Sequence, residues 1–359
     1  MQKKYSETTN ESELPCLTAP WAVSYLFTPN NLEKLHMNPF RGLIDEELKR
    51  FEVRLDEVMV ADVDLAHDIA RYMSTLKGKR LRPALALLSA QATGLKDSQR
   101  VIEAAVAVEM IHAATMVHDD VVDSATMRRG SDSVNEVWTG QIAVLMGDFL
   151  LARALCMLVE LGNLSALSVV SRATERLSIG EIFEIQIGEQ QDAREASYFA
   201  MVSDKTASLI SASARLGPIF ADADPLVVDS MGRYGELLGK AFQIADDILD
   251  FTGDATTMGK PVGHDLCEGK ITLPLIRALQ SAPESERLTM ERLLAQKEKN
   301  EMEWGRIVDF VDEQGGVAAA AVTAREVSAQ ALECLSVLPE TPAREALELA
   351  VRLVVERNS

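Results

Sequence analysis

Cysteine is scarce in this sequence. The 359 residues include only Cys16, Cys156, Cys267 and Cys334, and no two of them form a CxxC pair. This spacing indicates neither a disulfide framework nor a zinc site. Because reduced thiols are typical of proteins inside cells, we expect a cytoplasmic protein.

Positive charge is also in short supply. Lysine and arginine total 36 residues against 55 aspartates and glutamates, which gives a net charge of −19. A chain this acidic is a poor candidate for non-specific binding to nucleic acid or to an anionic membrane surface. We therefore expect no nucleic-acid partner, and the few basic clusters stand out.

The start of the chain lacks a long apolar run. The segment "APWAVSYLF" at residues 19–27 is too short to span a bilayer, so we expect no signal peptide and no integral membrane segment. Residues 1–38 are rich in Ser, Thr, Asn and Pro and show no period, which predicts a loosely ordered N-terminal extension. We expect residues 39–359 to form one domain.

Strand signals are missing as well. From about residue 40 onward apolar residues recur at helical spacings of three and four, as in Ile44, Leu48 and Phe51. Segment 98–123 is apolar on most sides, as a helix in the middle of a bundle would be. The predicted fold class is all-α, a single-domain bundle of long helices. Further helices are predicted over 134–160, 165–190, 195–221 and 225–251.

Acid is abundant, and it is concentrated in two DDxxD clusters that end predicted apolar helices. The six carboxylates belong to Asp119, Asp120, Asp123, Asp246, Asp247 and Asp250. Within each cluster the first and last Asp share a helix face, and the helix C-terminus adds partial negative charge. Mg²⁺ takes carboxylate oxygens together with substrate phosphates, so two such patches suit Mg²⁺ ions around a diphosphate. The alternative is two acidic helix ends capped by nearby Arg and Lys.

Basic residues and glycines accompany these clusters in a recurring order. The segments concerned are "GKRLRP", "HDDVVDSATMRRG", "DKT", "FQIADDILD" and "GKPVGHDLCEGKITLP". Taken in order, they resemble the motif set of the trans-isoprenyl diphosphate synthases, the polyprenyl synthetase family, over about residues 40–357. The resemblance implies the isoprenoid synthase fold, in which long helices surround a central apolar cavity, and it implies a homodimer.

The resemblance also implies a role for each matching residue. Three Mg²⁺ ions would be held directly by Asp119, Asp123 and Asp246, with Asp120, Asp247 and Asp250 acting through water or the outer shell. The allylic diphosphate would be gripped by Arg128, Lys205, Thr206, Gln243, Lys260 and Lys270. The second substrate, isopentenyl diphosphate, would be gripped by Lys79, Arg82, His112 and Arg129.

The implied reaction is a 1′–4, trans condensation of isopentenyl diphosphate with an allylic diphosphate, begun by Mg²⁺-assisted ionisation. Any membrane contact is expected to be transient and to serve product release. Three positions depart from the usual family pattern, namely Lys77, Asp132 and Glu184. None is expected to touch a proposed ligand, so we expect these departures to alter local shape rather than activity.

Product length depends on the helix upstream of Asp119, along which the growing chain would run. One turn upstream stand Ala114 and Thr115, which are small, and Ile111 lies a turn deeper. In the family, aromatic residues there favour farnesyl-length products. Their absence resembles the long-chain enzymes and predicts a polyprenyl diphosphate for quinone side chains. The alternative is a floor at Ile111 or on a neighbouring helix, which would give a farnesyl or geranylgeranyl product.

Two rival functions come from other classes. The dipeptide His118–Asp119 permits an HD-type metal phosphohydrolase, but that enzyme would leave the second DDxxD and the glycine-rich segment unexplained. A non-catalytic subunit supporting a catalytic partner would be expected to lose its Asp motifs, and this chain keeps both.

Overall fold

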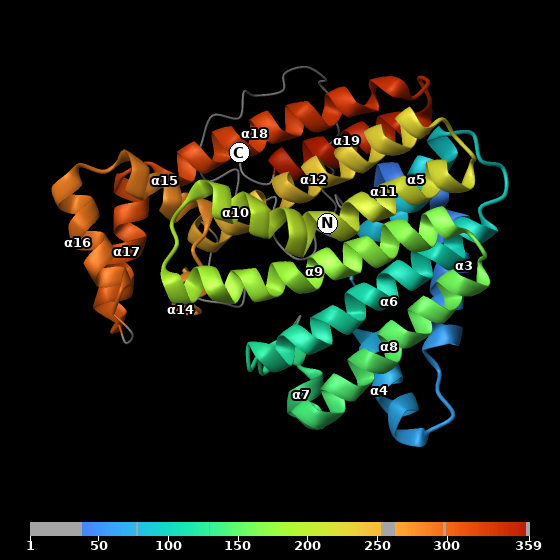
Figure 1. Cartoon of the computed structure of the whole chain (residues 1–359), viewed down its shortest axis with the longest axis horizontal. Coiled ribbons are helices and arrows are strands. Elements are labelled where there is room, and N and C mark those ends of the chain that lie inside the picture. Colours follow the sequence, from blue (N-terminus) through green and yellow to red (C-terminus); the bar gives the residue numbers. More distant parts are fainter. Residues whose placement is uncertain (1–37, 77, 129, 253–262, 297–298, 357–359) are drawn as a thin grey trace, which may run out of the picture. The chain divides into compact units, whose positions relative to one another are not determined.

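The computed structural model describes residues 38–356, apart from 77, 129, 253–262 and 297–298. The all-α prediction is confirmed, because long helices account for nearly all of the described chain (Figure 1). Of the expected N-terminal extension only Asn38 is described, at the start of the helix α3, and that expectation remains a prediction. The first helices are α3 (Asn38–Met59), α4 (Asp64–Thr75), α5 (Leu81–Ala92), α6 (Gln99–Val122), α7 (Val134–Val137), α8 (Gly140–Glu160) and α9 (Leu164–Gln190).

The second half of the chain continues the bundle. Its helices are α10 (Glu195–Val202), the π-helix η2 (Ser203–Ala207), α11 (Ser208–Phe220), α12 (Pro225–Thr252), α14 (His264–Cys267), α15 (Leu273–Ser281), α16 (Glu284–Leu294), α17 (Glu301–Glu313), α18 (Gly316–Cys334), the 3-10 turn η3 (Leu335–Val337) and α19 (Pro342–Glu356). Helix α12 packs extensively against α11 and α18. The two helices predicted to carry the acid clusters, α6 and α12, end at Val122 and Thr252, so each cluster does lie at a helix C-terminus.

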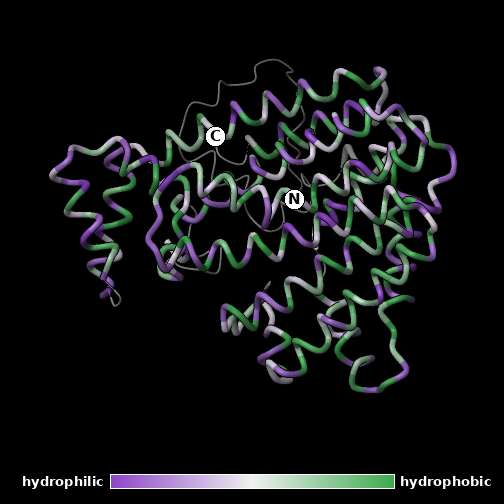
Figure 2. Tube along the Cα trace, in the orientation of Figure 1, coloured by the Kyte–Doolittle hydropathy of each residue, from purple (hydrophilic) through white to green (hydrophobic). Residues whose placement is uncertain are grey.

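Helix α6 is the centre of the first half. It packs most extensively against α8, which runs beside it in Figure 1, and also contacts α5 and α11. Both α6 and α8 are long and apolar enough to cross a membrane, and hydrophobic residues recur along both (Figure 2). The core helix of a globular protein passes the same test, and 67% of the apolar window of α6 is buried inside the protein. The prediction of a buried helix here is confirmed.

Three local features differ from the sequence-based expectation. The helix predicted over 134–160 is divided at Trp138, because Thr139 takes an extended conformation and accepts a hydrogen bond from the Ile142 nitrogen at 3.2 Å. The helix predicted over 195–221 contains the π-helical turn η2. A small hairpin joins Met127–Arg128 to Ser131–Asp132, with Gly130 at φ +76°. Strands of two residues are too short to show alternation.

Candidate active site

The first acid cluster lies where α6 ends. Asp120 is almost fully buried and accepts hydrogen bonds from Arg128, whose Nε lies 2.7 Å from its Oδ1. Burial, followed by repulsion from Glu181 on α9, raises the pKa of Asp119 to about 7, and Asp123 adds to the repulsion. Lys205 and Arg128 act in the opposite direction without cancelling it. The structure therefore gathers more negative than positive charge around Asp119.

His118 lies beside this cluster but is engaged elsewhere. Its Nε2 is 3.1 Å from the carbonyl oxygen of Val144 and 3.5 Å from Oδ1 of Asp148, both on α8. The ring fills the space left by Gly147, where a Cβ would collide with it. A packing role explains this contact, and it gives no support to an HD-type metal site.

Lys205 links η2 to α9 through two carboxylates. Its Nζ donates to Oε2 of Glu181 at 2.8 Å and to Oε2 of Glu184 at 2.5 Å. Burial by itself would lower the pKa of Lys205, but Glu184 and Glu181 outweigh it and raise that pKa. The expectation that the departure at Glu184 leaves the ligand positions untouched is therefore wrong, because Glu184 contacts one of them directly. The reason is long-range: the two residues lie on different helices, 21 positions apart.

The second acid cluster is organised by a chain of hydrogen bonds. Thr206 Oγ1 donates to Oε1 of Gln243 at 2.8 Å, and Gln243 Nε2 donates to Oδ1 of Asp247 at 2.9 Å. Tyr198 donates its hydroxyl to the other oxygen of Asp247 at 2.6 Å. Burial is nonetheless the dominant influence and raises the pKa of Asp247 to about 7. The neighbouring Asp246 is partly exposed, so Asp247 is the inner member of the pair.

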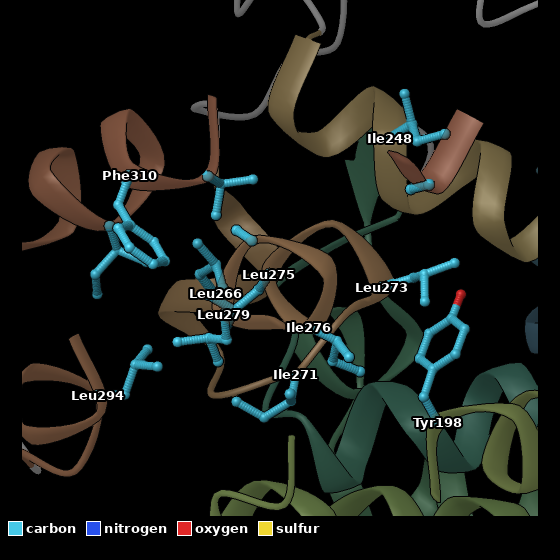
Figure 3. Close-up of a cluster of buried hydrophobic side chains, with 14 of the residues drawn as sticks. Tyr198, Ile248, Leu266, Ile271, Leu273, Leu275, Ile276, Leu279, Leu294 and Phe310 are labelled. Carbon is cyan, nitrogen blue, oxygen red and sulfur yellow. The ribbon is translucent and has the colours of Figure 1, made fainter. Parts of the chain in front are cut away.

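Tyr198 is held in place by apolar packing. Figure 3 shows it beside Leu273, with its hydroxyl directed toward the helix that bears Ile248. Its side chain is 1% exposed. A buried phenol needs a hydrogen-bond partner, and Asp247 supplies it. The hydrophobic cluster around α15 thus holds Tyr198, which in turn orients Asp247 of the second DDxxD motif.

The segment after α12 returns to the same region. The backbone nitrogen of Asp265 donates to Oδ2 of Asp250 at 3.2 Å, and the nitrogen of Gly263 donates to the Asp250 carbonyl at 2.9 Å. Lys270 donates to Glu268 at 2.7 Å. Burial by itself would lower the pKa of Lys270, but attraction to Glu184 and the hydrogen bond to Glu268 outweigh it, so the pKa is raised. Lys205 and Lys270 therefore both interact with Glu184.

The other predicted site residues that the structure describes lie on α5 and α6 or just before α5. Lys79 and Arg82 flank the start of α5, and His112 lies on α6 two turns before Asp119. Arg80, between Lys79 and Arg82, is used structurally: it pairs with Glu52 and Glu109, each at 2.8 Å. The chain-length candidates Ala114 and Ile111 are buried and Thr115 is half-buried. Arg129 and Lys260 lie outside the described residues.

The donors present fit a cation shared with a ligand rather than a closed metal cage. Within the described part of the chain, no three His, Cys, Asp or Glu side chains converge as a metal-binding group. Mg²⁺ usually keeps several waters and takes one or two carboxylates together with substrate phosphates. Asp119, with the carboxylates of Asp123 and Glu181 near it, offers oxygen ligands of this kind.

Several residues of this region were not singled out from the sequence. Glu181 and Tyr198 touch Lys205 and Asp247 directly, and Arg176 and Glu236 lie in an adjoining ion-pair network. Of these four residues, only Glu181 could have been noticed in the sequence. It follows Gly180 directly and lies in the same helix segment as Glu184, one of the departures from the family pattern named above. The contacts of Tyr198 with Asp247, and of Arg176 with Asp204 and Glu236, join residues 49, 28 and 60 positions apart.

Comparison with known proteins agrees with this arrangement. The profile of the family described as Polyprenyl synthetase matches residues 63–311. The chain belongs to this family. It is 37% identical over 303 residues to an all-trans-nonaprenyl-diphosphate synthase (geranyl-diphosphate specific) of Rhodobacter capsulatus, covering 84% of this chain and 92% of that one. It is 34% identical over 329 residues to the octaprenyl diphosphate synthase of Escherichia coli K12, covering 91% and 99%.

Solved structures show the same relationship. A polyprenyl synthase from Caulobacter crescentus CB15, complexed with calcium and isoprenyl diphosphate, superposes with a TM-score of 0.84 at 33% identity, covering 90% of this chain and 98% of that one. The isoprenoid synthase fold is therefore confirmed. So is the predicted enzyme class, a trans-polyprenyl diphosphate synthase of the long-chain type, which is a prenyltransferase. A divalent metal and an isoprenyl diphosphate are bound by that related polyprenyl synthase.

Proposed function

We propose that this polyprenyl synthetase condenses isopentenyl diphosphate with an allylic diphosphate, repeatedly and in the 1′–4 trans sense, to a long-chain polyprenyl diphosphate for quinone side chains. The observation that carries the proposal is the charge at the end of α6. Lys205 pairs with Glu181 and Glu184, and Asp119 lies near Lys205, Glu181 and Asp123. This mixture of charges suits a ligand that brings both cations and phosphates. The long-chain relatives support the product class.

Magnesium is the cation that this donor set favours, with three ions expected and held directly by Asp119, Asp123 and Asp246. When bound, it stabilises negative charge on a departing diphosphate. Asp120 contributes by fixing Arg128 through their ion pair, and Asp247 and Asp250 act from the outer shell. Calcium in the related polyprenyl synthase supports a divalent ion.

The basic residues bind and orient the two substrates. Lys205, Arg128 and Lys270 neutralise the allylic diphosphate, and the Thr206–Gln243 pair offers it further polar contacts. Lys260 belongs to the same group, and Arg129 joins Lys79, Arg82 and His112 at the isopentenyl diphosphate. The allylic C–O bond breaks, the alkene of isopentenyl diphosphate attacks the allylic carbon, and a proton leaves to the released diphosphate. Preorganised cations supply most of the stabilisation for such charge separation.

The test is a condensation assay with labelled isopentenyl diphosphate, farnesyl diphosphate and Mg²⁺, with products separated by chain length. We expect products well beyond geranylgeranyl. We also expect complete loss of incorporation with excess EDTA and recovery when Mg²⁺ is restored. Termination at geranylgeranyl would contradict the long-chain product, and the absence of any condensation would contradict the enzyme itself.

We also propose that the enzyme works in the cytoplasm as a homodimer, joined through an apolar face of α8 and α9. This face is defined by Leu145, Val159, Ile179 and Ile182, whose side chains are between 54% and 63% exposed. Only 39% of the apolar window of α8 is buried. Large exposed apolar patches mark interaction sites in proteins. A second copy is the occupant that the family resemblance implies.

Light scattering over a range of concentrations tests the dimer. The wild type is expected at twice 39.3 kDa, and Leu145→Glu and Val159→Glu are expected at the mass of one chain, because a buried unpaired carboxylate opposes association. Met302→Glu on α17 is the matched control, since Met302 is also apolar and 79% exposed. A monomeric wild type, or dimers in both α8 variants, would overturn this proposal.

A further inference from the structure

The backbone that carries Lys205 has an unusual conformation. Residues Ser203–Ala207 form the π-helix η2, inserted between two α-helices. Such π-turns are rare and recur at functional sites. Here the backbone of Lys205 presses against Gly180 of α9 so closely that a Cβ at Gly180 would collide with it. The direction of the Lys205 side chain therefore depends on how η2 is fixed against α9.

Arg176, one turn before Gly180 on α9, makes that attachment. Its Nε donates to Oδ1 of Asp204 at 2.6 Å, and its Nη2 donates to the carbonyl of Ser203 at 3.0 Å. The guanidinium thus grips the two residues of η2 that immediately precede Lys205. A planar guanidinium can satisfy several acceptors in fixed directions, which a lysine ammonium cannot reproduce.

The same guanidinium also reaches α12. Nη1 and Nη2 of Arg176 donate to the two oxygens of Glu236 at 3.2 and 3.1 Å, and Ser203 Oγ donates to Glu236 at 2.7 Å. Glu236 lies two turns before Gln243 on one helix. One side chain therefore joins the three elements that carry Glu181 and Glu184, Lys205 and Thr206, and Gln243 with the second acid cluster.

We propose that Arg176 is a positioning residue for prenyl transfer. Through Asp204, Ser203 and Glu236 it sets the π-turn so that Lys205 reaches the carboxylates of α9 and Thr206 reaches Gln243. Arg176 does not touch the substrate; it acts through Lys205 and Thr206. This inference rests on the proposed function, in which those two residues bind the allylic diphosphate.

The first measurement is the kinetics of Arg176→Met and Arg176→Lys with each substrate varied. We expect KM for the allylic diphosphate to rise, and kcat to fall, by about tenfold each, as is common when an orienting partner is lost. KM for isopentenyl diphosphate should stay unchanged, since its proposed ligands Lys79, Arg82 and His112 lie at the start of α5 and on α6. Arg176→Lys should be as impaired as Arg176→Met, because lysine keeps the positive charge but lacks the planar guanidinium with its several donors.

Arg54→Met is the matched control. Arg54 is similarly exposed, 37% against 40% for Arg176, and it also bridges two helices, with Nε 3.0 Å from both oxygens of Glu103. A purely structural Arg176 would lower thermal stability as Arg54→Met does and leave both KM values unchanged. That result would overturn the proposal.

A double-mutant cycle with Lys205→Met separates this inference from the function on which it rests. If Arg176 acts through Lys205, the kinetic effect of Arg176→Met should largely disappear in the Lys205→Met background. Full additivity of the two changes would refute the coupling. An inactive wild type would instead refute the proposed function. Binding of inorganic diphosphate with Mg²⁺, measured by calorimetry, gives a readout without turnover, and Arg176→Met should weaken it about tenfold.

Discussion

Replacing Asp119 with Asn is expected to abolish most prenyl transfer while making the metal-free protein more stable. The activity loss should be at least about 10²–10³-fold in kcat, the usual cost of removing one preorganised electrostatic contact. The stability gain follows from the cost of the Asp119 charge: burial first, and then repulsion from Glu181 and Asp123, raise the pKa of Asp119 to about 7. Removing that charge should add roughly 1 kcal/mol to the free energy of unfolding, since one pKa unit corresponds to about 1.4 kcal/mol.

This combination distinguishes a metal-binding carboxylate from an acidic helix end capped by cations. A capped Asp119 would contribute favourable ion pairs, so its removal would lower the unfolding temperature measured in EDTA. Glu175→Gln is a suitable control, because Glu175 is an exposed acid on α9 with no place in the proposed site. Loss of both activity and stability in Asp119→Asn would contradict the metal-ligand assignment. Stabilisation by added Mg²⁺ and diphosphate should also be reduced in the variant.

The parts of the fold and site that the sequence predicts are those with local signals. The helical period of α6 and its apolar composition predict a buried helix. The DDxxD spacing places two carboxylates on one face at its C-terminal end. The same holds for α12 and Asp246. Tertiary structure is needed to bring η2 to both helices, so that Lys205 lies near Asp119 and Thr206 bonds Gln243. The apolar surroundings of each helix made this outcome predictable, because a charged helix end in a bundle core requires a partner.

The parts that the sequence does not predict depend on contacts between distant segments. Glu184 looks like a minor departure until α9 and η2 come together and its carboxylate meets Lys205. The π-turn itself has no period of its own, because its five residues continue the pattern of α10 and α11. Arg176 reads as an ordinary surface arginine of α9, yet its partners are 28 and 60 positions away. Positioning networks of this kind become visible only with the folded chain.

Replacing Thr115 with Phe is expected to shorten the product from long-chain to farnesyl or geranylgeranyl length. Thr115 lies one turn before Asp119 on α6. In the described part of the chain its hydroxyl donates to the His112 carbonyl of the same helix at 3.0 Å. It is half-buried, so a larger side chain can be accommodated without the overpacking expected at Ala114, which is 1% exposed. A helix rises about 5.4 Å per turn, roughly one isoprene unit, so a ring at this depth blocks growth early.

Ala113→Phe is the matched control for this change. Ala113 is also partly buried on α6, but two residues along a helix are separated by about 200°, so its ring should project to another side. The assay compares product length and the rate of the first condensation with geranyl diphosphate for both variants. We expect that rate to survive in Thr115→Phe, because the proposed diphosphate-binding residues are untouched. Unchanged long-chain products in Thr115→Phe, or equal shortening in Ala113→Phe, would show that the growing chain does not follow this face of α6.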